Sequence, residues 1–162
     1  MPHENETHGH GGLLLNRNVV AWLLLVTALA VHVLDEALTD FLHFYNPLVR
    51  DLKETLGFFP MPTFTFGIWL GGLIGLVIVG FALTPLVNRG GRIIRRFTMA
   101  FGIIMVLNAL GHMLGSLFVG RLLPGFWSSP LLLVAALYAV IVGLRRPTPS
   151  PGLAESRAEP GF

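Results

Sequence analysis

The sequence contains no cysteine and has very little charge. The absence of cysteine excludes a disulfide framework, thiolate metal ligands and a thiol nucleophile, and it removes one guide to the redox compartment. Only 12% of the 162 residues are charged, whereas 53% are apolar. This composition is unusual for a water-soluble domain and typical of a membrane protein.

Long uncharged runs define the predicted fold class. A helix needs about twenty apolar residues to cross a hydrocarbon core of about 30 Å. Four segments are predicted to do so, namely residues 18–44, 63–84, 97–120 and 126–144. The fourth is the shortest, and its Pro130 suits a first helical turn. The sequence therefore predicts an all-α integral membrane protein with a four-transmembrane-helix bundle in residues 17–146.

Three other features complete the predicted organisation. Between the first two spans, Asn46 as N-cap, Pro47 in the first turn and Gly57 at the end predict a short amphipathic helix on the outer surface. Glycines at 67, 71 and 75, and at 111 and 115, predict close helix packing. Residues 1–16, with His3, His8 and His10, and residues 147–162 are predicted to be flexible tails.

Basic residues predict the orientation. If both termini are cytoplasmic, the inside carries Arg17, Arg89, Arg92, Arg95, Arg96, Arg145 and Arg146, and the outside only Arg50, Lys53 and Arg121. This bias indicates a multi-pass protein of a prokaryotic inner membrane. The segment NRGGRIIRR suits anionic lipid headgroups, and nucleic acid is not expected as a partner. Homo-oligomerisation is left open by the sequence.

The start of the chain has a second interpretation. Arg17, an apolar run and the small residues Ala28 and Ala30 imitate a cleaved signal peptide. Cleavage would leave three spans and place His32 at a new N-terminus. An uncleaved first helix keeps an even number of spans and agrees with the arginine bias, so it is preferred.

The stretch HVLDEALTDFLH interrupts the first apolar segment with charge. At helical spacing, His32, Asp35 and Glu36 share one stripe inside the predicted span, whereas Asp40 and His43 approach its outer end. A charge facing lipid costs several kcal/mol, so the stripe is expected to face the bundle interior or water.

A matching polar pair occurs in the third predicted span. Asn108 and His112 are four residues apart and therefore share one helix face. At about 1.5 Å per residue, they lie roughly 16 to 22 Å along their helix, and His32 to Glu36 roughly 21 to 27 Å along theirs. The depths overlap, so His32, Asp35, Glu36, Asn108 and His112 are predicted to form one site.

The residue types leave three chemistries open. His32, Asp35, Glu36 and His112 could hold a divalent metal such as Zn²⁺, Fe²⁺ or Mn²⁺. The same groups, with Asn108 as orienter, could act as a metal-free acid/base couple, because a desolvated carboxylate binds its proton more tightly. A hydrogen-bond network that only fixes helix register is the third interpretation.

These motifs resemble a family of small bacterial and archaeal integral membrane proteins named for an HXXEE motif. Its three signatures are H-x-x-E-E, N-A-x-x-H and Y-x-P-G. Here they begin at His32, Asn108 and Leu122, with Asp35 in place of the first Glu and Leu122 in place of the Tyr. The likeness covers roughly residues 20 to 144. The family's activity is unassigned, so the resemblance supports the choice of site and implies no reaction.

Three functions follow from these observations. The preferred hypothesis is a membrane-embedded enzyme acting on a lipid-soluble molecule, such as an isoprenoid, a sterol-like compound or an acyl lipid, with Pro124 and Gly125 shaping a turn above the site. Aromatic residues near the outer end, including Phe41 and Phe44, could line an apolar access route, although such belts are common at membrane interfaces. The alternatives are a small proton- or ion-coupled transporter, or transporter subunit, and a structural or accessory membrane protein.

Overall fold

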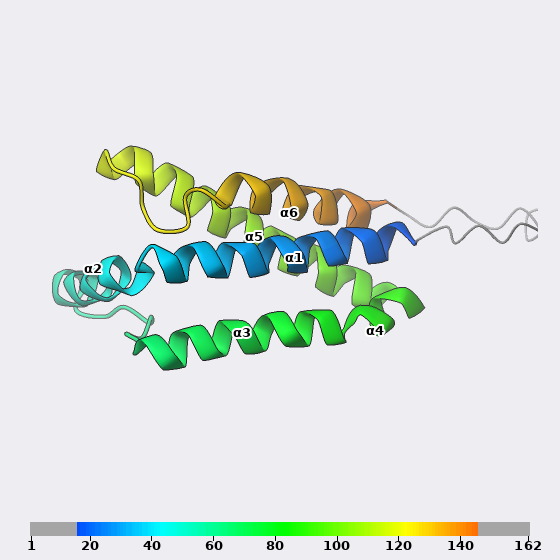
Figure 1. Cartoon of the computed structure of the whole chain (residues 1–162), viewed down its shortest axis with the longest axis horizontal. Coiled ribbons are helices and arrows are strands. Elements are labelled where there is room, and N and C mark those ends of the chain that lie inside the picture. Colours follow the sequence, from blue (N-terminus) through cyan, green and yellow to red (C-terminus); the bar gives the residue numbers. More distant parts are fainter. Residues whose placement is uncertain (1–15, 146–162) are drawn as a thin grey trace, which may run out of the picture.

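A computed structural model describes residues 16–145 as a bundle of helices, and no strand occurs within that range. Figure 1 shows α1 between α3 and α6, with α5 crossing behind them. The predicted tails, including His3, His8 and His10, lie outside the described residues, except that Asn16 caps α1 by accepting a hydrogen bond from Asn18 N. The helices are α1 Arg17–Leu38, α2 Phe41–Leu56, α3 Phe66–Ala82, α4 Thr84–Arg89, α5 Arg92–Val119 and α6 Ser129–Leu144.

The all-helical prediction is confirmed, but within residues 16–145 three stretches rather than four are long and apolar enough to cross a membrane. These are Arg17–Leu38, Phe66–Arg89 and Arg92–Val119. The predicted fourth span is shortened because residues 126–128 form turns, so α6 begins at Ser129. Its 16 residues reach only about 24 Å. Pro130 does lie in the first turn of α6, as expected.

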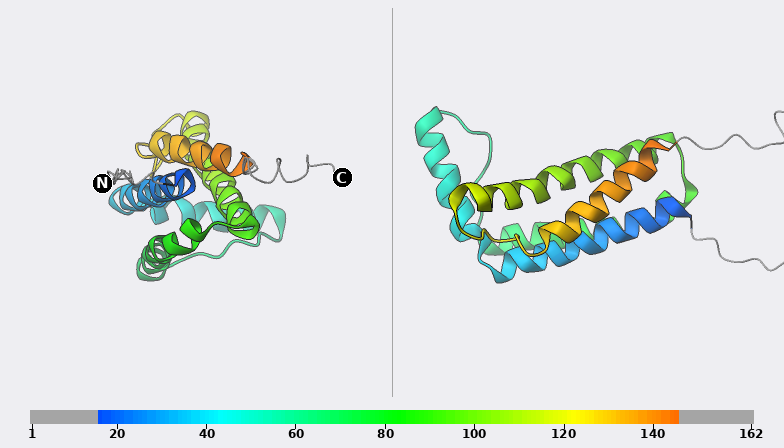
Figure 2. Two further views of the ribbon diagram at one scale, coloured as in Figure 1. Left: turned by 90° about the vertical axis from the view of Figure 1, so that its right-hand side faces the viewer. Right: turned by 90° about the horizontal axis from the view of Figure 1, so that it is seen from above.

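The predicted first span is also wrong at its outer end. Instead of continuing to residue 44, α1 stops at Leu38, and Asp40 adopts the left-handed conformation with φ 56°. Asp tolerates this conformation better than most residues, since its short side chain can bond locally. The chain then turns into α2, which crosses one end of the bundle (Figure 2). The predicted continuous helix is therefore two helices that meet between Leu38 and Phe41.

The structure confirms a short helix between the first two predicted spans, but this helix begins earlier than predicted. It begins at Phe41, six residues before Pro47, and ends at the predicted Gly57, whose φ of 71° favours glycine. Asn46 is not its N-cap; its side chain instead holds Phe64 N and O, at 3.0 and 2.9 Å. Of the apolar residues on this helix, Val49 is buried, whereas Leu48 and Leu56 are exposed.

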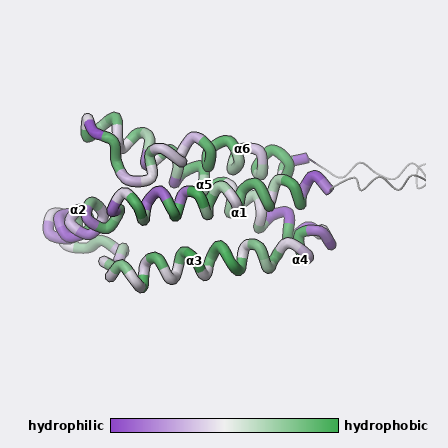
Figure 3. The backbone as a smooth tube through the Cα atoms, viewed as in Figure 1, coloured by the Kyte–Doolittle hydropathy of each residue, from purple (hydrophilic) through white to green (hydrophobic). Residues whose placement is uncertain are grey.

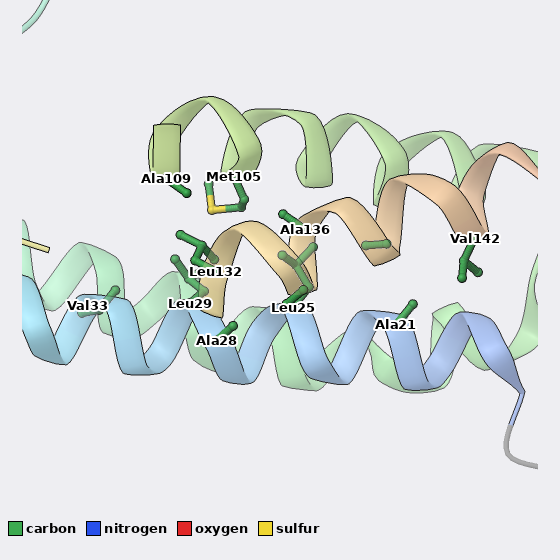
Figure 4. Packing of buried hydrophobic residues seen from close by; sticks show 12 residues of the cluster. Ala21, Leu25, Ala28, Leu29, Val33, Met105, Ala109, Leu132, Ala136 and Val142 are labelled. Atoms are coloured by element: carbon green, nitrogen blue, oxygen red, sulfur yellow. The ribbon is translucent and has the colours of Figure 1, made fainter. Parts of the chain in front are cut away.

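The main core joins α1, α5 and α6. Its centre contains Leu25, Leu29, Met105, Leu132 and Ala136, and Figure 4 shows these side chains meeting between the three helices. A smaller cluster around Trp22 ties α1 to α3 and α4, and the Trp22 indole N–H donates to Gly80 O at 2.8 Å. Helix α1 therefore packs on two sides, mainly against α6 and α3.

The glycine prediction is wrong in its details. A Cβ at Gly67, Gly71, Gly75 or Gly111 would meet nothing within 4 Å, so these positions make no close packing among the described residues. Of the predicted glycines, Gly115 does approach a neighbour tightly, because a Cβ there would lie 3.0 Å from Leu123. Two further tight approaches occur at positions that were not predicted, at Gly80 against Val26 and at Gly102 against Val140, both at 3.0 Å. Periodicity alone did not reveal which glycine face meets a neighbour.

Apolar side chains cover the outside of the bundle as well as its core. Ile78 is 61% exposed and Phe118 is 96% exposed. Figure 3 shows hydrophobic residues along α3 and much of α5 and α6, with hydrophilic residues gathered in α2 and around the α4–α5 turn. Exposed apolar surface on this scale marks an interaction surface rather than a solvated one.

Candidate functional site

Two helices and one loop bring the polar residues together near the α2 end of the bundle. On α1, His32 and Glu36 are four residues apart, and on α5, Asn108 and His112 have the same spacing, so each pair projects from one helix face. The two pairs meet, as their depths along the helices predicted. Both His32 and Glu36 are buried, at 1% and 6% exposure.

His32 is fixed by hydrogen bonds to both ring nitrogens. Asn108 Nδ2 lies 3.0 Å from His32 Nε2, and an amide NH₂ can only donate, so Nε2 accepts. The proton of the neutral ring is then on Nδ1, which donates to Ser128 Oγ at 2.8 Å. Ser128 Oγ donates in turn to Asp35 Oδ2 at 2.7 Å. A directed chain therefore runs from Asn108 through His32 and Ser128 to Asp35.

Asp35 lies at the end of this chain and also at the start of α6. Its Oδ2 accepts from Ser128 N at 2.9 Å as well as from the hydroxyl. A carboxylate is stabilised at a helix N-terminus, where backbone N–H groups are unpaired and the helix dipole is positive. The structure thus gives Asp35 and Glu36 different surroundings. Asp35 binds the loop and, through Ser128, His32, and it does not join the group formed by Glu36 and the two imidazoles.

His112 and Glu36 form the closest contact between ionisable groups in the site. His112 Nδ1 donates to the carbonyl of Pro124, which can only accept. Nε2 therefore carries the lone pair of the neutral ring, and it faces Glu36 Oε1 at 3.1 Å. Two facing lone pairs repel each other, whereas a proton or a metal cation between these atoms would join them.

The Pro124–Gly125 turn covers the pair, as the sequence predicted for these residues. Gly125 has φ of 80°, and a Cβ there would lie 3.0 Å from Glu36 Cγ and from His112 Nδ1. Only glycine combines that backbone conformation with so close an approach. Ser116 Oγ anchors the start of the loop by accepting from Leu123 N at 2.9 Å and donating to His112 O at 2.7 Å.

Three ligand-type atoms are close enough to suit a metal ion. His32 Nε2 lies 3.7 Å from Glu36 Oε1, and potential ligand atoms of His32, Glu36 and His112 all lie within 4.8 Å of one another. Around an ion with bonds of about 2.0 to 2.2 Å, neighbouring ligand atoms are separated by about 3 to 4 Å. Both Nδ1 atoms are already held by hydrogen bonds, as is usual for metal-binding histidines. Asn108 would have to release His32 Nε2 before a metal could bind there.

A hollow of about 260 Å³ leads to this group from the side of the bundle. Asn108 and His112 form its polar part, and Phe41, Phe44 and Leu107 belong to its apolar part. The ring centroid of Phe41 lies 5.7 Å from that of His112 and 5.6 Å from that of Trp69. An apolar molecule could thus reach His112 from the surface that Leu107 exposes.

The two remaining ionisable residues of the stretch HVLDEALTDFLH lie apart from this group. Asp40 and His43 border a separate hollow of about 200 Å³ with Arg121 and Pro124. Ser128, in contrast, is central to the site, yet it was missing from the predicted site because the predicted helix began at Phe126 and absorbed it. The dipeptide Ser128–Ser129 before Pro130 was an available signal, since Ser is favoured at N-caps and Pro follows them.

Fold and site together define a class: a helical bundle whose described residues include three apolar helices of membrane-spanning length, with a largely buried His–Glu–His group at one end. The chain belongs to the family described as proteins of unknown function with an HXXEE motif, which matches residues 22–140. The matched range contains the whole site. Comparison with curated proteins and with solved structures found no match to the chain.

Proposed function

We propose that this protein is a membrane-embedded enzyme that transfers a proton to or from a lipid-soluble molecule. The observation that carries the proposal is the 3.1 Å contact between Glu36 Oε1 and His112 Nε2 beside an apolar hollow. A buried carboxylate and imidazole that share one proton can act as an acid/base couple, and either can exchange that proton with a substrate held nearby.

The proposed membrane setting rests on the apolar exterior and the distribution of charge. Helices α1, α5 and the joined α3 and α4 are long enough to span, and we propose that α6 lies within the same layer, because it is apolar and packs against α1 and α5. Most of the described arginines gather at the end where α1 begins and α6 ends. This distribution supports cytoplasmic termini in a prokaryotic inner membrane, with the site in the outer half of the bilayer.

Each polar residue has a role in this scheme. The Glu36–His112 pair removes a proton from one carbon of the substrate. It then returns a proton to another carbon or to the same one, so that atoms balance. Asn108 on Nε2 and the Asp35–Ser128 pair on Nδ1 hold the His32 ring in a fixed orientation against Glu36. Phe41 and Leu107 admit an isoprenoid, sterol-like or acyl chain.

Deuterium uptake tests the proposal across several classes of lipid. Purified full-length protein in vesicles would be incubated in D₂O with an isoprenoid alcohol, a sterol and an unsaturated phospholipid, followed by mass spectrometry. We expect carbon-bound deuterium with the native chain and none with Glu36→Gln or His112→Ala. Asp51→Asn, on the exposed side of α2, is the matched control. No uptake in any sample, together with proton-coupled flux across the vesicles, would instead favour a transporter.

A metal-assisted version of this enzyme is the second candidate. It is favoured by the grouping of His32, Glu36 and His112 within 4.8 Å, with both Nδ1 atoms held. These three residues would hold the ion, which would supply Lewis-acid polarisation of a substrate oxygen. Elemental analysis for Zn, Fe and Mn separates the two versions. One metal per chain, lost in His112→Ala and retained in Asp35→Asn, supports the metal site; metal-free protein that retains deuterium uptake rejects it.

A further inference from the structure

A second cavity lies at the end of the bundle opposite the His–Glu–His group. It has a volume of about 290 Å³ and is enclosed by the start of α1, the α4–α5 turn, the first two turns of α5 and the end of α6. Arg92, Arg95 and Thr98 line it from α5, and Gly90 and Gly91 from the turn. None of these residues belongs to the proposed enzyme site.

Positive charge around this cavity has no acidic counterpart among residues 16–145. The first turn of α5 contains no acidic residue, although it begins with Arg92 and is followed by Arg95 and Arg96. The carboxylates in the described range all lie toward the opposite end, between the last turn of α1 and the end of α2, at Asp35, Glu36, Asp40, Asp51 and Glu54. Cations at a helix N-terminus are unfavourable, because the helix dipole is positive there. A bound anion would remove this conflict.

The cavity also presents hydrogen-bond donors. Thr98 is only 6% exposed and lines the cavity, where its hydroxyl can donate a hydrogen bond. The first backbone N–H groups of α5 lack partners inside the helix. One guanidinium nitrogen of Arg95 donates a hydrogen bond to Arg145 O at 3.5 Å. The other guanidinium N–H groups of Arg95 remain available for a ligand.

From the cavity, the Thr98 hydroxyl that lines it and the arginines that face no carboxylate of residues 16–145, we infer that this site binds the phosphate group of an anionic membrane phospholipid. Phosphate oxygens only accept hydrogen bonds, and Arg, Thr and backbone N–H supply matching donors. The volume suits a headgroup rather than a whole lipid. The acyl chains would then follow the apolar exterior of the bundle, which a free phosphate ion could not do.

Native mass spectrometry of the full chain in detergent tests this inference. The probes are phosphatidylglycerol, zwitterionic phosphatidylcholine and inorganic phosphate. We expect one phosphatidylglycerol per chain, bound at least about tenfold more tightly than the other two. The double variant Arg92→Gln, Arg95→Gln and the nearly isosteric Thr98→Val should each weaken this binding about tenfold or more, as expected for hydrogen bonds to a charged group.

Arg96→Gln is the matched control, because Arg96 is exposed on the same turn but does not line the cavity. The affinity of Arg96→Gln for phosphatidylglycerol should stay within about threefold of the native value. If this variant lost as much affinity as the double variant, or if Thr98→Val lost none, the binding would be general surface attraction and the site would be overturned. Inorganic phosphate that binds as tightly as phosphatidylglycerol would overturn the lipid assignment. Thermal stability of each variant, measured without lipid, shows that the fold is retained.

Discussion

Helices α1 and α3 are both long and apolar, and they lie side by side, but their surroundings differ greatly. Helix α1 is enclosed by α3 and α6 and carries His32 and Glu36 within its buried face. Helix α3 buries little beyond Trp69 and Gly80, and its sequence contains no ionisable side chain. A helix can thus carry buried charge only where neighbours supply hydrogen-bond partners, whereas a helix facing lipid needs apolar side chains all round.

Core truncation should show the largest difference between the two helices. Leu25→Ala on α1 removes a fully buried side chain between α5 and α6 and should cost about 2 to 5 kcal/mol of unfolding free energy, because it leaves a cavity. Ile78→Ala on α3, at a position 61% exposed, should change it by no more than about 0.5 kcal/mol. Unfolding in mixed detergent and denaturant measures both. Equal losses would show that α3 is buried against another chain.

The second-largest effect is expected at Gly125, which covers the His–Glu–His group. In Gly125→Ala, the new alanine must adopt φ of 80° and place its Cβ 3.0 Å from Glu36 and His112. The substitution should therefore lower the free energy of unfolding by about 2 to 3 kcal/mol and abolish deuterium uptake. Gly120→Ala is the matched control, since φ is 71° but nothing lies within 4 Å. It should lose only about 1 to 2 kcal/mol of backbone strain and retain activity. Equal effects of the two substitutions would remove the covering role of Gly125.

Removing the bridge between His32 and Asp35 should have a moderate effect. Ser128→Ala leaves a buried imidazole N–H and a carboxylate without their shared partner, and we expect a loss of about 1 to 3 kcal/mol. Thr39→Val, which removes an exposed hydroxyl bonded to Asp35 O, should cost within about 0.5 kcal/mol. Thermal denaturation of the purified variants checks this order. If Ser128→Ala left the stability unchanged, the hydroxyl bridge would contribute nothing to it.

The smallest effects are expected on the open face of α3. Gly71→Ala has free space for its Cβ and should raise stability by up to about 1 kcal/mol, because alanine favours helix more than glycine does. Gly80→Ala, in contrast, meets both Val26 methyl groups at 3.0 Å and should be destabilising. Stability in detergent and the oligomeric state of both variants would be measured. Destabilisation by Gly71→Ala with loss of an oligomer would mean that a second chain covers this face.

The sequence predicted much of the candidate site because helical spacing restricts the geometry so strongly. Residues four apart share a face, and equal depth along two helices was enough to bring His32 and Glu36 to Asn108 and His112. Spacing could not separate the roles of Asp35 and Glu36, which are adjacent in sequence. Their different partners, Ser128 and His112, come from a loop and a helix far along the chain.

The sequence by itself determined the helical class, the apolar exterior and the charge difference between the two ends, since these depend on composition and local periodicity. Tertiary structure decided the break at Asp40, the shortening of α6 and which glycines approach a neighbour, because competing local preferences there were settled by packing. It also decided that Ser128 joins His32 to Asp35. A short polar side chain acquires such a role only when the loop that carries it is folded onto a partner helix.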